Sequence, residues 1–493
     1  MTIDFTHLIP EFILGSLGLL VLLVDLLIPK KLNHLRNTTA AVITLIGLAI
    51  ALFWCLYDLR NVKAIIYDQL IFVDHFSLIF KVIFMGTGIA VTLMSIHYVE
   101  QKIRHSAEYY ALIVFSVLGA VIMASAGELL TAYIGLELLS FSLYVLVGLS
   151  RNDKRTPEAS TKYILLGAVS SGIFLYGLSI LYGTLGTTAF REMDQTLFLL
   201  ADHPSVIMGF GMLLAGLAFK LAIVPFHIWA PDIYEGAPTP ITALISILAK
   251  AATFALVLRF LAEATQASYS SWQLSLAIVA ALSMSVGSLV ALVQTNIKRL
   301  MAYSSITQVG FITMGLASLA SANTTLIDNQ NAANAIILHI VGYSFSSLAA
   351  FMVITMVETK LAIESIKDYS GLAKRSPFLA MVLTASLLSL AGLPIFSGFI
   401  TKFYLFTSAA TADLIWLVAI AAIASLVSLY YYLGVIRYMY IGEVDSEVSK
   451  LSFHKSSLFT LLILFLGIIV VGIYPGPIIN AAESATSTLG PFI

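Results

Sequence analysis

Four lysines of this sequence stand inside long apolar stretches, where charged side chains are rare: Lys162, Lys220, Lys250 and Lys402. A charge at the centre of a membrane-spanning helix costs at least about 2.5–3.5 kcal/mol, so such residues usually face the protein interior and mark an ion or proton path. Burial disfavours the charged amine, which lets a buried lysine both hold and release a proton near neutral pH. The chemistry that these lysines could do is therefore proton transfer.

A buried acid and two histidines could share this chemistry. Glu137 lies in the middle of an apolar stretch, and a nearby carboxylate stabilises the charged form of a lysine. We therefore predict that Glu137 holds the proton on Lys220. His227 and His339 are suited to carry protons near neutral pH, although an isolated histidine on an apolar helix is more often a hydrogen-bonded core residue. Neither has the spacing of a metal ligand.

Two further basic residues, Lys81 and Arg259, lie nearer to the ends of their apolar stretches. Long side chains at such positions can extend their charge to the membrane surface. We expect both to do so. Glu128 stands where a helix is expected to start, and it is expected to be a solvated cap there.

The composition indicates a membrane protein. Of the 493 residues 59% are hydrophobic and only 11% are charged, against about 25% charged residues in a soluble domain. The single cysteine, Cys55, excludes an internal disulfide, a four-cysteine metal or iron–sulfur site and a haem attachment motif. We find no nucleotide-binding glycine motif, and a net charge of −1 offers no basic surface for nucleic acid.

The elements that must position these residues are predicted to be about fourteen transmembrane helices. No long polar stretch between them could hold a soluble catalytic domain. The N-terminal stretch lacks the basic start of a signal peptide, so we interpret it as a retained first span. The predicted spans are 9–29, 38–57, 72–97, 108–126, 127–149, 160–186, 205–229, 239–264, 273–294, 300–320, 331–358, 376–406, 411–436 and 456–480.

The positive charges support this number of spans. Of the 26 Lys and Arg residues, 17 fall in the odd-numbered connections, 3 in the even-numbered connections and tails, and 6 inside spans. Basic residues favour the cytoplasmic side of a membrane. The predicted topology therefore places both termini on the non-cytoplasmic side of a multi-pass membrane protein.

Two of the predicted spans contain helix breakers next to a buried lysine. Pro225 follows Lys220, and Pro394 precedes Lys402. Proline removes a backbone donor and breaks a helix, and broken backbone at membrane depth is tolerated only inside protein or beside a wet cavity. The two breaks lie five spans apart, so a five-span unit repeated in tandem must be inverted, as in many transporters.

Several segments carry a family resemblance. Together they resemble the antiporter-like membrane subunits of respiratory complex I, over the fourth to thirteenth spans. Within this family the chain is most similar to the N type, because span eight carries Lys250 and because Lys402 stands where the M type has glutamate. The L type continues into a long lateral helix that is absent here. The matching segments are Gly135–Leu138, Lys162–Tyr163, Lys220–Pro240, Thr295–Arg299, Ala302–Ser305 and Gly392–Phe403.

The resemblance implies a function and a setting. It implies a proton-translocating subunit of NADH:quinone oxidoreductase in a bacterial inner membrane, driven by NADH oxidation and quinone reduction in other subunits. NAD, FMN, iron–sulfur clusters and quinone are expected in those partners, and no cofactor or metal is expected in this chain. The implied neighbours are M-, K- and L-type subunits and the lipid bilayer, with no nucleic acid and no soluble substrate except protons.

The predicted proton path runs from Lys220 through Lys250 and His339 to Lys402, with Lys162 tuning the Glu137–Lys220 pair. Thr401 stands where the family often has glycine, and we expect no effect on the chemistry. The role of His339 stays open.

The predicted domain division follows the repeats. It has three N-terminal spans (1–107), a first five-helix repeat (108–265), a second, inverted repeat (266–440), and a cytoplasmic loop with the last span (441–493). Two other functions remain open: a cation/proton antiporter subunit of the Mrp type, which needs no NADH, and a non-transporting scaffold, which does not explain the buried charges.

Overall fold

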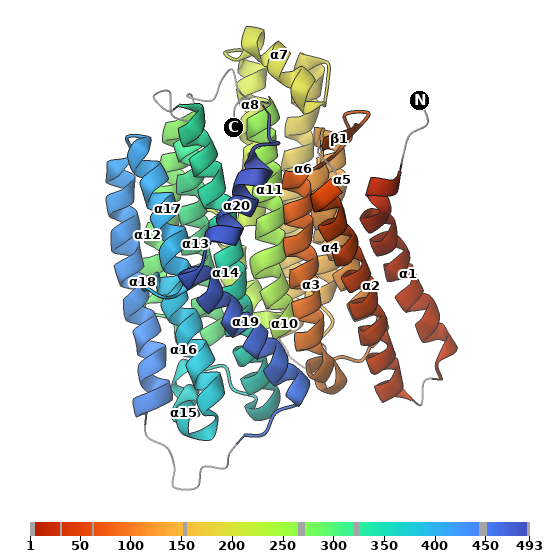
Figure 1. Cartoon of the computed structure of the whole chain (residues 1–493), viewed down its shortest axis with the longest axis vertical. Helices are drawn as coiled ribbons and strands as arrows, with labels where there is room; N and C mark the ends of the chain where they lie inside the picture. Colours follow the sequence, from red (N-terminus) through yellow and green to blue (C-terminus); the bar gives the residue numbers. More distant parts are fainter. Residues whose placement is uncertain are drawn as a thin grey trace.

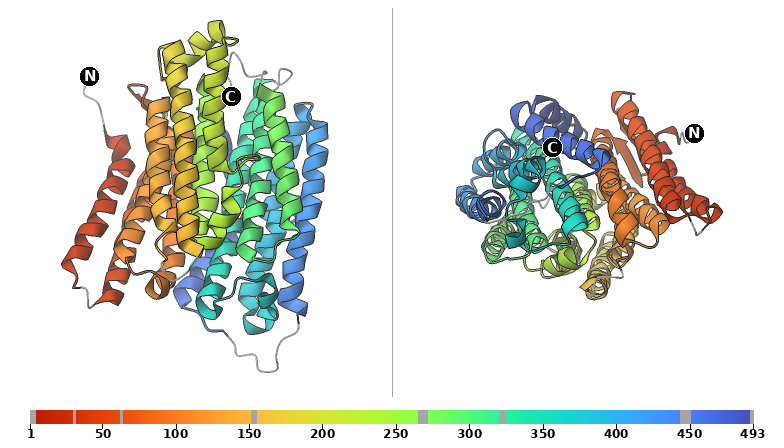
Figure 2. Two further views of the ribbon diagram at one scale, coloured as in Figure 1. Left: turned by 180° about the vertical axis from the view of Figure 1, so that it is seen from behind. Right: turned by 90° about the horizontal axis from the view of Figure 1, so that it is seen from below.

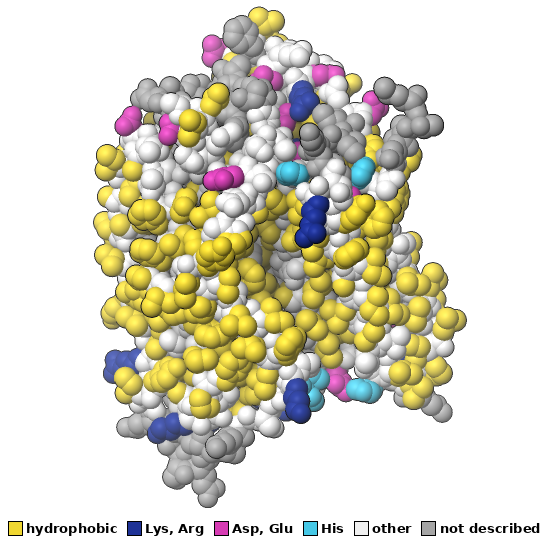
Figure 3. Space-filling model, in the orientation of Figure 1, with side chains coloured by type: hydrophobic (Ala, Val, Ile, Leu, Met, Phe, Trp, Pro, Cys, Tyr) yellow, Lys and Arg dark blue, Asp and Glu magenta, His cyan; other side chains and the backbone are white. Residues whose placement is uncertain are grey.

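The computed structural model describes residues 5–29, 32–61, 64–150, 155–264, 272–319, 325–442 and 451–490. The chain forms one bundle of long helices that run up and down side by side (Figure 1). Hydrophobic side chains cover a broad band around the middle of the visible face, and most charged side chains lie toward its two ends (Figure 3). The molecule is an all-α polytopic membrane protein.

Among the described residues, thirteen helical segments are long and apolar enough to cross a membrane. The pair α16–α17 makes one more crossing, because α17 continues α16 after a short break. The predicted spans are thus present, with the helices extending several residues past the predicted ends in places. Some predicted limits lie too far out: the third span, predicted from residue 72, starts at His75, and the fourteenth, predicted to residue 480, ends at Ile473. The helices of the crossings are α1 (Ile9–Leu27), α2 (Asn33–Asn61), α3 (His75–Lys102), α4 (Ser106–Ser125), α5 (Leu129–Val147), α6 (Arg155–Leu185), α8 (Pro204–Leu221), α9 (Trp229–Gly236), α10 (Thr239–Leu244), α11 (Lys250–Ala264), α12 (Gln273–Ala291), α13 (Ile297–Leu319), α14 (Leu326–Leu361), α16 (Pro377–Ala391), α17 (Ser397–Thr411), α18 (Ile415–Ile441) and α19 (Lys455–Ile473).

Short elements outside the membrane spans were not predicted. Strands β1 (Ala64–Tyr67) and β2 (Ile71–Asp74) form an antiparallel hairpin, whose turn places Asp68 and Gln69 at φ 47° and 60°. A left-handed turn of this kind matches the twist of the two strands. There are also two 11-residue helices, α7 (Phe190–Leu200) and α20 (Gly476–Thr486), and a 4-residue helix, α15 (Leu372–Arg375). Short 3-10 helices are present at Thr6–Leu8 and Ile366–Tyr369.

The first described residues and the end of α20 lie at the same end of the bundle (Figures 1 and 2). We call this the terminal end and the other the opposite end. The hairpin and α7 lie at the terminal end (Figure 1). An even number of crossings brings the chain back to the end where it began.

The centre of the bundle is the span Thr239–Ala264, whose whole apolar window is buried inside the protein. The neighbouring spans α13 and α14 are 94% and 89% buried over the same kind of window. By contrast, α2, α6 and α18 expose most of theirs to the surroundings. Lys250 therefore lies on the most enclosed helix of the chain.

The expectation that Lys81 and Arg259 extend to the membrane surface is wrong, because both side chains are 0% exposed. Lys81 forms an ion pair with Glu11 of α1 at 2.6 Å. Arg259 donates two 2.8 Å hydrogen bonds to the carboxylate of Asp74, the residue before α3. The partners come from helices far away in the sequence, which periodicity along one helix cannot reveal.

Candidate functional site

Two crossings are broken near the middle of the bundle. Helix α8 ends at Leu221, where Ala222 adopts a left-handed conformation, and the chain resumes as α9 at Trp229. Helix α16 ends at Ala391 before Gly392, which has φ 91°, and α17 begins at Ser397. Pro225 and Pro394 stand inside these two breaks. Each break frees backbone carbonyls that a nearby cation can use.

Lys220 lies in the last turn of α8 and is buried. Its amine donates to the hydroxyl of Ser140 at 2.7 Å and to that of Tyr144 at 2.9 Å, both on α5. The amine also lies 5.3 Å from the centre of the Tyr144 ring. The ammonium is thus solvated by neutral groups.

Glu137 is on the same helix, one turn before Ser140, and has a half-buried side chain. Its Oε1 atom is buried and has no hydrogen-bond partner. No ion pair within 4.0 Å joins Glu137 to Lys220 in the described chain. The structure therefore places Glu137 on the helix whose Ser140 and Tyr144 accept from Lys220, without a direct contact between the predicted pair.

Lys162 does not contact Glu137, contrary to the prediction that it tunes this carboxylate. Its amine pairs with Glu158 and with Asp232, both at 2.7 Å, and its side chain is 41% exposed. Asp232 belongs to α9, the second half of the broken crossing. The i,i+4 spacing of Glu158 and Lys162 is a sequence signal for the first of these pairs. The pair with Asp232 depends on how α9 packs against α6 and has no such signal.

Lys250 follows a π-helical segment, Ile245–Ala249, inside the buried central span. Its amine donates to Ser305 Oγ of α13 at 2.5 Å and lies 5.8 Å from the Tyr234 ring centre. Tyr234 also shares a 3.3 Å hydrogen bond with Ser305. Single-turn π segments are frequent at functional sites, and this one ends directly before Lys250.

His339 and Lys402 lie together at the second break. His339 Nδ1 is 3.0 Å from the hydroxyl of Thr401, and its Nε2 is buried without a partner. Lys402 donates to the carbonyl of Ala391 at 3.1 Å and to Ser425 at 3.2 Å. Thr401, expected to be neutral for the chemistry, is thus the group that holds His339.

His227 lies in the first break and is half-buried. Its Nδ1 is buried and unpartnered, while its neighbours Phe226 and Ile228 are exposed. Among the described residues, no hydrogen bond or ion pair joins it to Lys220, whose amine contacts Ser140 and Tyr144 instead. The structure therefore separates His227 from the buried lysines.

Sequence analysis missed the neutral polar groups of this region. Ser140, Tyr144 and Ser305 accept from the lysines, and Gln308 lies in a small cavity of about 10 Å³ beside Lys250. Gln308 also donates to the carbonyl of Leu390, the residue before the Lys402 acceptor. Serines are common in apolar helices, so the sequence does not single out Ser140 or Ser305. Their hydrogen bonds to lysines become visible only in the folded structure.

An ionic network covers the opposite end of the bundle. Arg299 pairs with Asp232 and Glu235 at 2.9 Å each. Arg155 and Lys298 pair with Glu364 at 2.7 and 3.1 Å. Burial would raise the pKa of Glu364, but Lys298 and Arg155 outweigh this effect and hold the pKa below its usual value. The network ties α6, α9 and α13 to the loop after α14.

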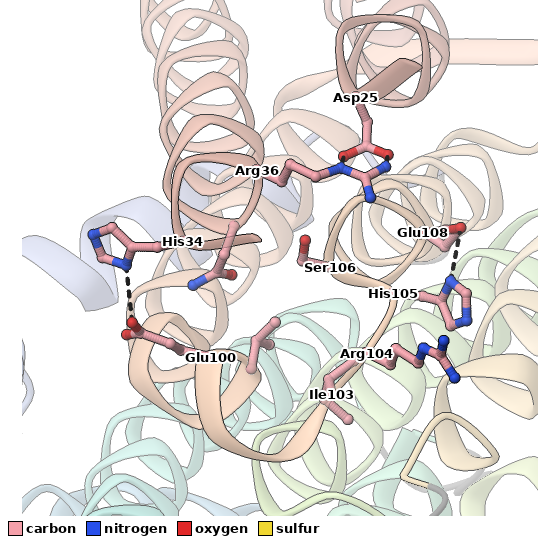
Figure 4. A pocket seen from close by; sticks show the side chains of 11 residues that line it. Asp25, His34, Arg36, Glu100, Ile103, Arg104, His105, Ser106 and Glu108 are labelled. Atoms are coloured by element: carbon pink, nitrogen blue, oxygen red, sulfur yellow. Dashed lines mark hydrogen bonds and ion pairs between the residues drawn. The ribbon is translucent and has the colours of Figure 1, made fainter. Parts of the chain in front are cut away.

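A pocket of about 290 Å³ also lies at this end, between the starts of α2 and α4 and the end of α3. Its side chains pair with one another: His34 with Glu100, His105 with Glu108, and Arg36 with Asp25 (Figure 4). His34 is 78% exposed. We interpret these ion pairs as structural contacts that hold neighbouring helices together at the surface. Within the described part of the chain no group of three His, Cys, Asp or Glu residues could hold a metal ion.

Comparisons with known proteins agree with this architecture. Residues 126–428 match the family described as NADH:quinone oxidoreductase/Mrp antiporter, TM. The NADH-quinone oxidoreductase subunit N of Desulforamulus reducens is 38% identical over 99% of both chains. The NAD(P)H-quinone oxidoreductase subunit 2 of Gloeobacter violaceus is 37% identical and covers 97% of this chain and 91% of its own.

Solved structures show the same fold. A chain of respiratory complex I from Thermus thermophilus superposes with a TM-score of 0.79 and 28% identity, covering 96% of this chain and 99% of its own. A chain of an archaeal membrane-bound sulfane sulfur reductase gives a TM-score of 0.87 and 26% identity, covering 98% and 97%. Bundle, broken helices and buried lysines define an antiporter-like membrane subunit. The chain belongs to the NADH:quinone oxidoreductase/Mrp antiporter membrane family, in the branch of the subunit N relatives.

Proposed function

We propose that this protein translocates protons as a membrane-arm subunit of NADH:quinone oxidoreductase in a bacterial cytoplasmic membrane. The observation that carries the proposal is the set of three buried lysines, Lys220, Lys250 and Lys402, whose amines contact neutral acceptors and no carboxylate within the described residues. NADH oxidation and quinone reduction take place in partner subunits, which hold NAD, FMN, iron–sulfur clusters and quinone. The M-, K- and L-type subunits are the proposed neighbours.

The proton resides on Lys220 when Glu137 is close and leaves when the carboxylate moves away. Ser140, which accepts from Lys220, holds the ammonium in place during this change. From Lys220 the proton moves by way of waters to Lys250, and then past Gln308 and His339 to Lys402. His227 could act as an additional proton carrier in the first break.

The energy scale fits this mechanism. Moving one charge across 100 mV costs about 2.3 kcal/mol. A rearrangement that changes a lysine pKa by two units is worth about 2.7 kcal/mol. One ion-pair change in the Glu137–Lys220 region is therefore large enough to drive one proton.

The two breaks also support the inverted-repeat organisation, with the divisions at about residues 107, 265 and 440. The opposite end, which carries the ionic network, faces the cytoplasm in this proposal, and both termini face the other side. Lys162 holds α9 through its ion pair with Asp232, and it thereby influences the position of the first break.

The test uses the assembled enzyme. Lys220→Ala or Glu137→Ala should lower proton pumping per NADH, with the complex assembled at the normal level on a native gel. Normal pumping and quinone reductase turnover in both variants would contradict the assigned path.

An antiporter of the Mrp type shares the same fold, because a chain of the Mrp complex from Dietzia superposes with a TM-score of 0.83 at 19% identity. Native gels distinguish the two. Migration of the wild-type chain with an NADH-oxidising complex supports the oxidoreductase, whereas migration in a smaller assembly with Na⁺-dependent proton exchange supports the antiporter.

A further inference from the structure

A polar cavity of about 430 Å³ opens at the opposite end of the bundle. It is lined by the end of α3 with Tyr98 and Lys102, by Arg155 and Lys298, and by Glu358 near the end of α14. At about 30 Å³ per water, this space holds on the order of ten waters. The cavity thus leads water from the surface to a single carboxylate that is not part of the ionic network.

Glu358 is only 6% exposed. Its carboxylate accepts from the hydroxyl of Thr239 and from that of Tyr98 at 3.4 Å. Among the described residues no basic side chain forms an ion pair with it. Hydroxyl groups both donate and accept, so they can hold Glu358 as carboxylate and as carboxylic acid.

Polar groups continue from Glu358 toward Lys250. Along α14, Ser347, Phe351, Thr355 and Glu358 follow at intervals of four, four and three residues and so lie on one face. The hydroxyl of Thr355 is buried and has no hydrogen-bond partner, which marks a position for a bridging water. Ser347 is 3.3 Å from Ser246, inside the π segment that precedes Lys250.

The geometry points to Glu358 as the group that takes up protons from this cavity and delivers them toward Lys250. A hydronium ion in the cavity gives its proton to a carboxylate oxygen and leaves neutral water. The carboxylic acid then gives the proton to a water at Thr355 and returns to the carboxylate. Phe351 separates Thr355 from Ser347, so the next transfer takes place when a water passes this ring.

The inference rests on the proposed function, and the test separates the two. In the assembled complex, Glu358→Gln should lower the rate of proton pumping about tenfold, a modest loss for a proton-transfer group. Glu358→Asp should restore most of the rate. Glu108→Gln is the control, since this acid is at the same end but 49% exposed. The residual rate of Glu358→Gln should also depend more steeply on the pH of the cavity side.

A block of the cavity provides an independent measurement. Lys102 is partly exposed and the native Cys55 is buried, so Lys102→Cys can be modified after assembly. A bulky neutral thiol reagent should stop pumping in this variant, and a reducing agent should restore it, while the treated wild-type complex stays active. This measurement tests proton uptake through the cavity even if the Glu358→Gln variant fails to assemble.

Two outcomes would overturn the inference. If Glu358→Gln pumps at the wild-type rate and modified Lys102→Cys stays active, while Lys220→Ala is inactive, the uptake role of Glu358 is wrong and the proposed function stands. If Lys220→Ala also pumps normally, the proposed function itself fails.

Discussion

At the residue scale, five of the buried cations differ in the kind of oxygen atom that they contact. Lys220, Lys250 and Lys402 contact hydroxyl and carbonyl oxygens. Lys81 and Arg259 contact carboxylates. A carboxylate stabilises the charged form much more than a neutral acceptor does. This difference agrees with the proposed function, in which the first three release a proton, and we assign the last two a structural role.

The hydroxyls of Ser140 and Tyr144, which accept hydrogen bonds from Lys220, should each raise the proton affinity of this lysine. Ser140→Ala or Tyr144→Phe removes one hydrogen bond to a charged group, worth about 1.5–3 kcal/mol. We expect slower proton pumping in each variant and a larger, non-additive loss in the double variant, measured with the assembled complex. Ser142→Ala is the control, because Ser142 lies on the same helix and, within the described residues, donates to the carbonyl of Leu138 rather than contacting Lys220. Equal rates for the Ser140 and Ser142 variants would contradict this role.

At the element scale, the second helix break frees a backbone carbonyl that accepts a hydrogen bond from a buried lysine. Helix α16 ends at Ala391, so the carbonyl of this residue is available to Lys402. The left-handed Gly392 makes the turn possible. The position of both breaks was predictable from proline and glycine. The carbonyl that accepts from Lys402 was not predictable, because it depends on how α17 packs after the break.

Gly392→Ala should disturb this break. An alanine there adopts a left-handed conformation at a cost of about 1–2 kcal/mol, and its Cβ would lie 3.0 Å from Lys402 Cδ. We expect a lower thermal stability of the solubilised complex and reduced pumping. Gly434→Ala, with no atom within 4 Å of the added Cβ, is the control. A Gly392 variant that behaves like the Gly434 variant would show that the turn tolerates a side chain.

At the scale of the whole molecule, buried ion pairs join distant helices. Asp74 precedes α3 and binds Arg259 of the central region, which also donates to the carbonyl of Ala124 at 3.1 Å. Burial would raise the pKa of Asp74, but Arg259 outweighs it and holds the pKa below the usual value. The stability from this pair is therefore present above the ordinary aspartate pKa and is lost as the pH falls through the lowered value.

Asp74→Asn should thus destabilise the protein at neutral pH by about 3–5 kcal/mol, because it leaves Arg259 as an unpaired buried charge. The expected result is a lower melting temperature and less assembled complex on a native gel. Asp68→Asn in the exposed hairpin turn is the matched control. The difference between Asp74→Asn and wild type should shrink in acid, and a difference that stays constant down to low pH would contradict the assignment.

Local sequence determined much of this protein. The apolar stretches predicted the crossings, and proline and glycine predicted the breaks, because hydropathy and backbone restriction act over a few neighbouring residues. The assignment of the chemistry to charges such as Glu137 and Lys220 stays a prediction. Only the tertiary structure decided which groups meet. Lys162 pairs with Asp232, Arg259 with Asp74, and Lys250 with Ser305, since each contact depends on the packing of helices that are far apart in the chain.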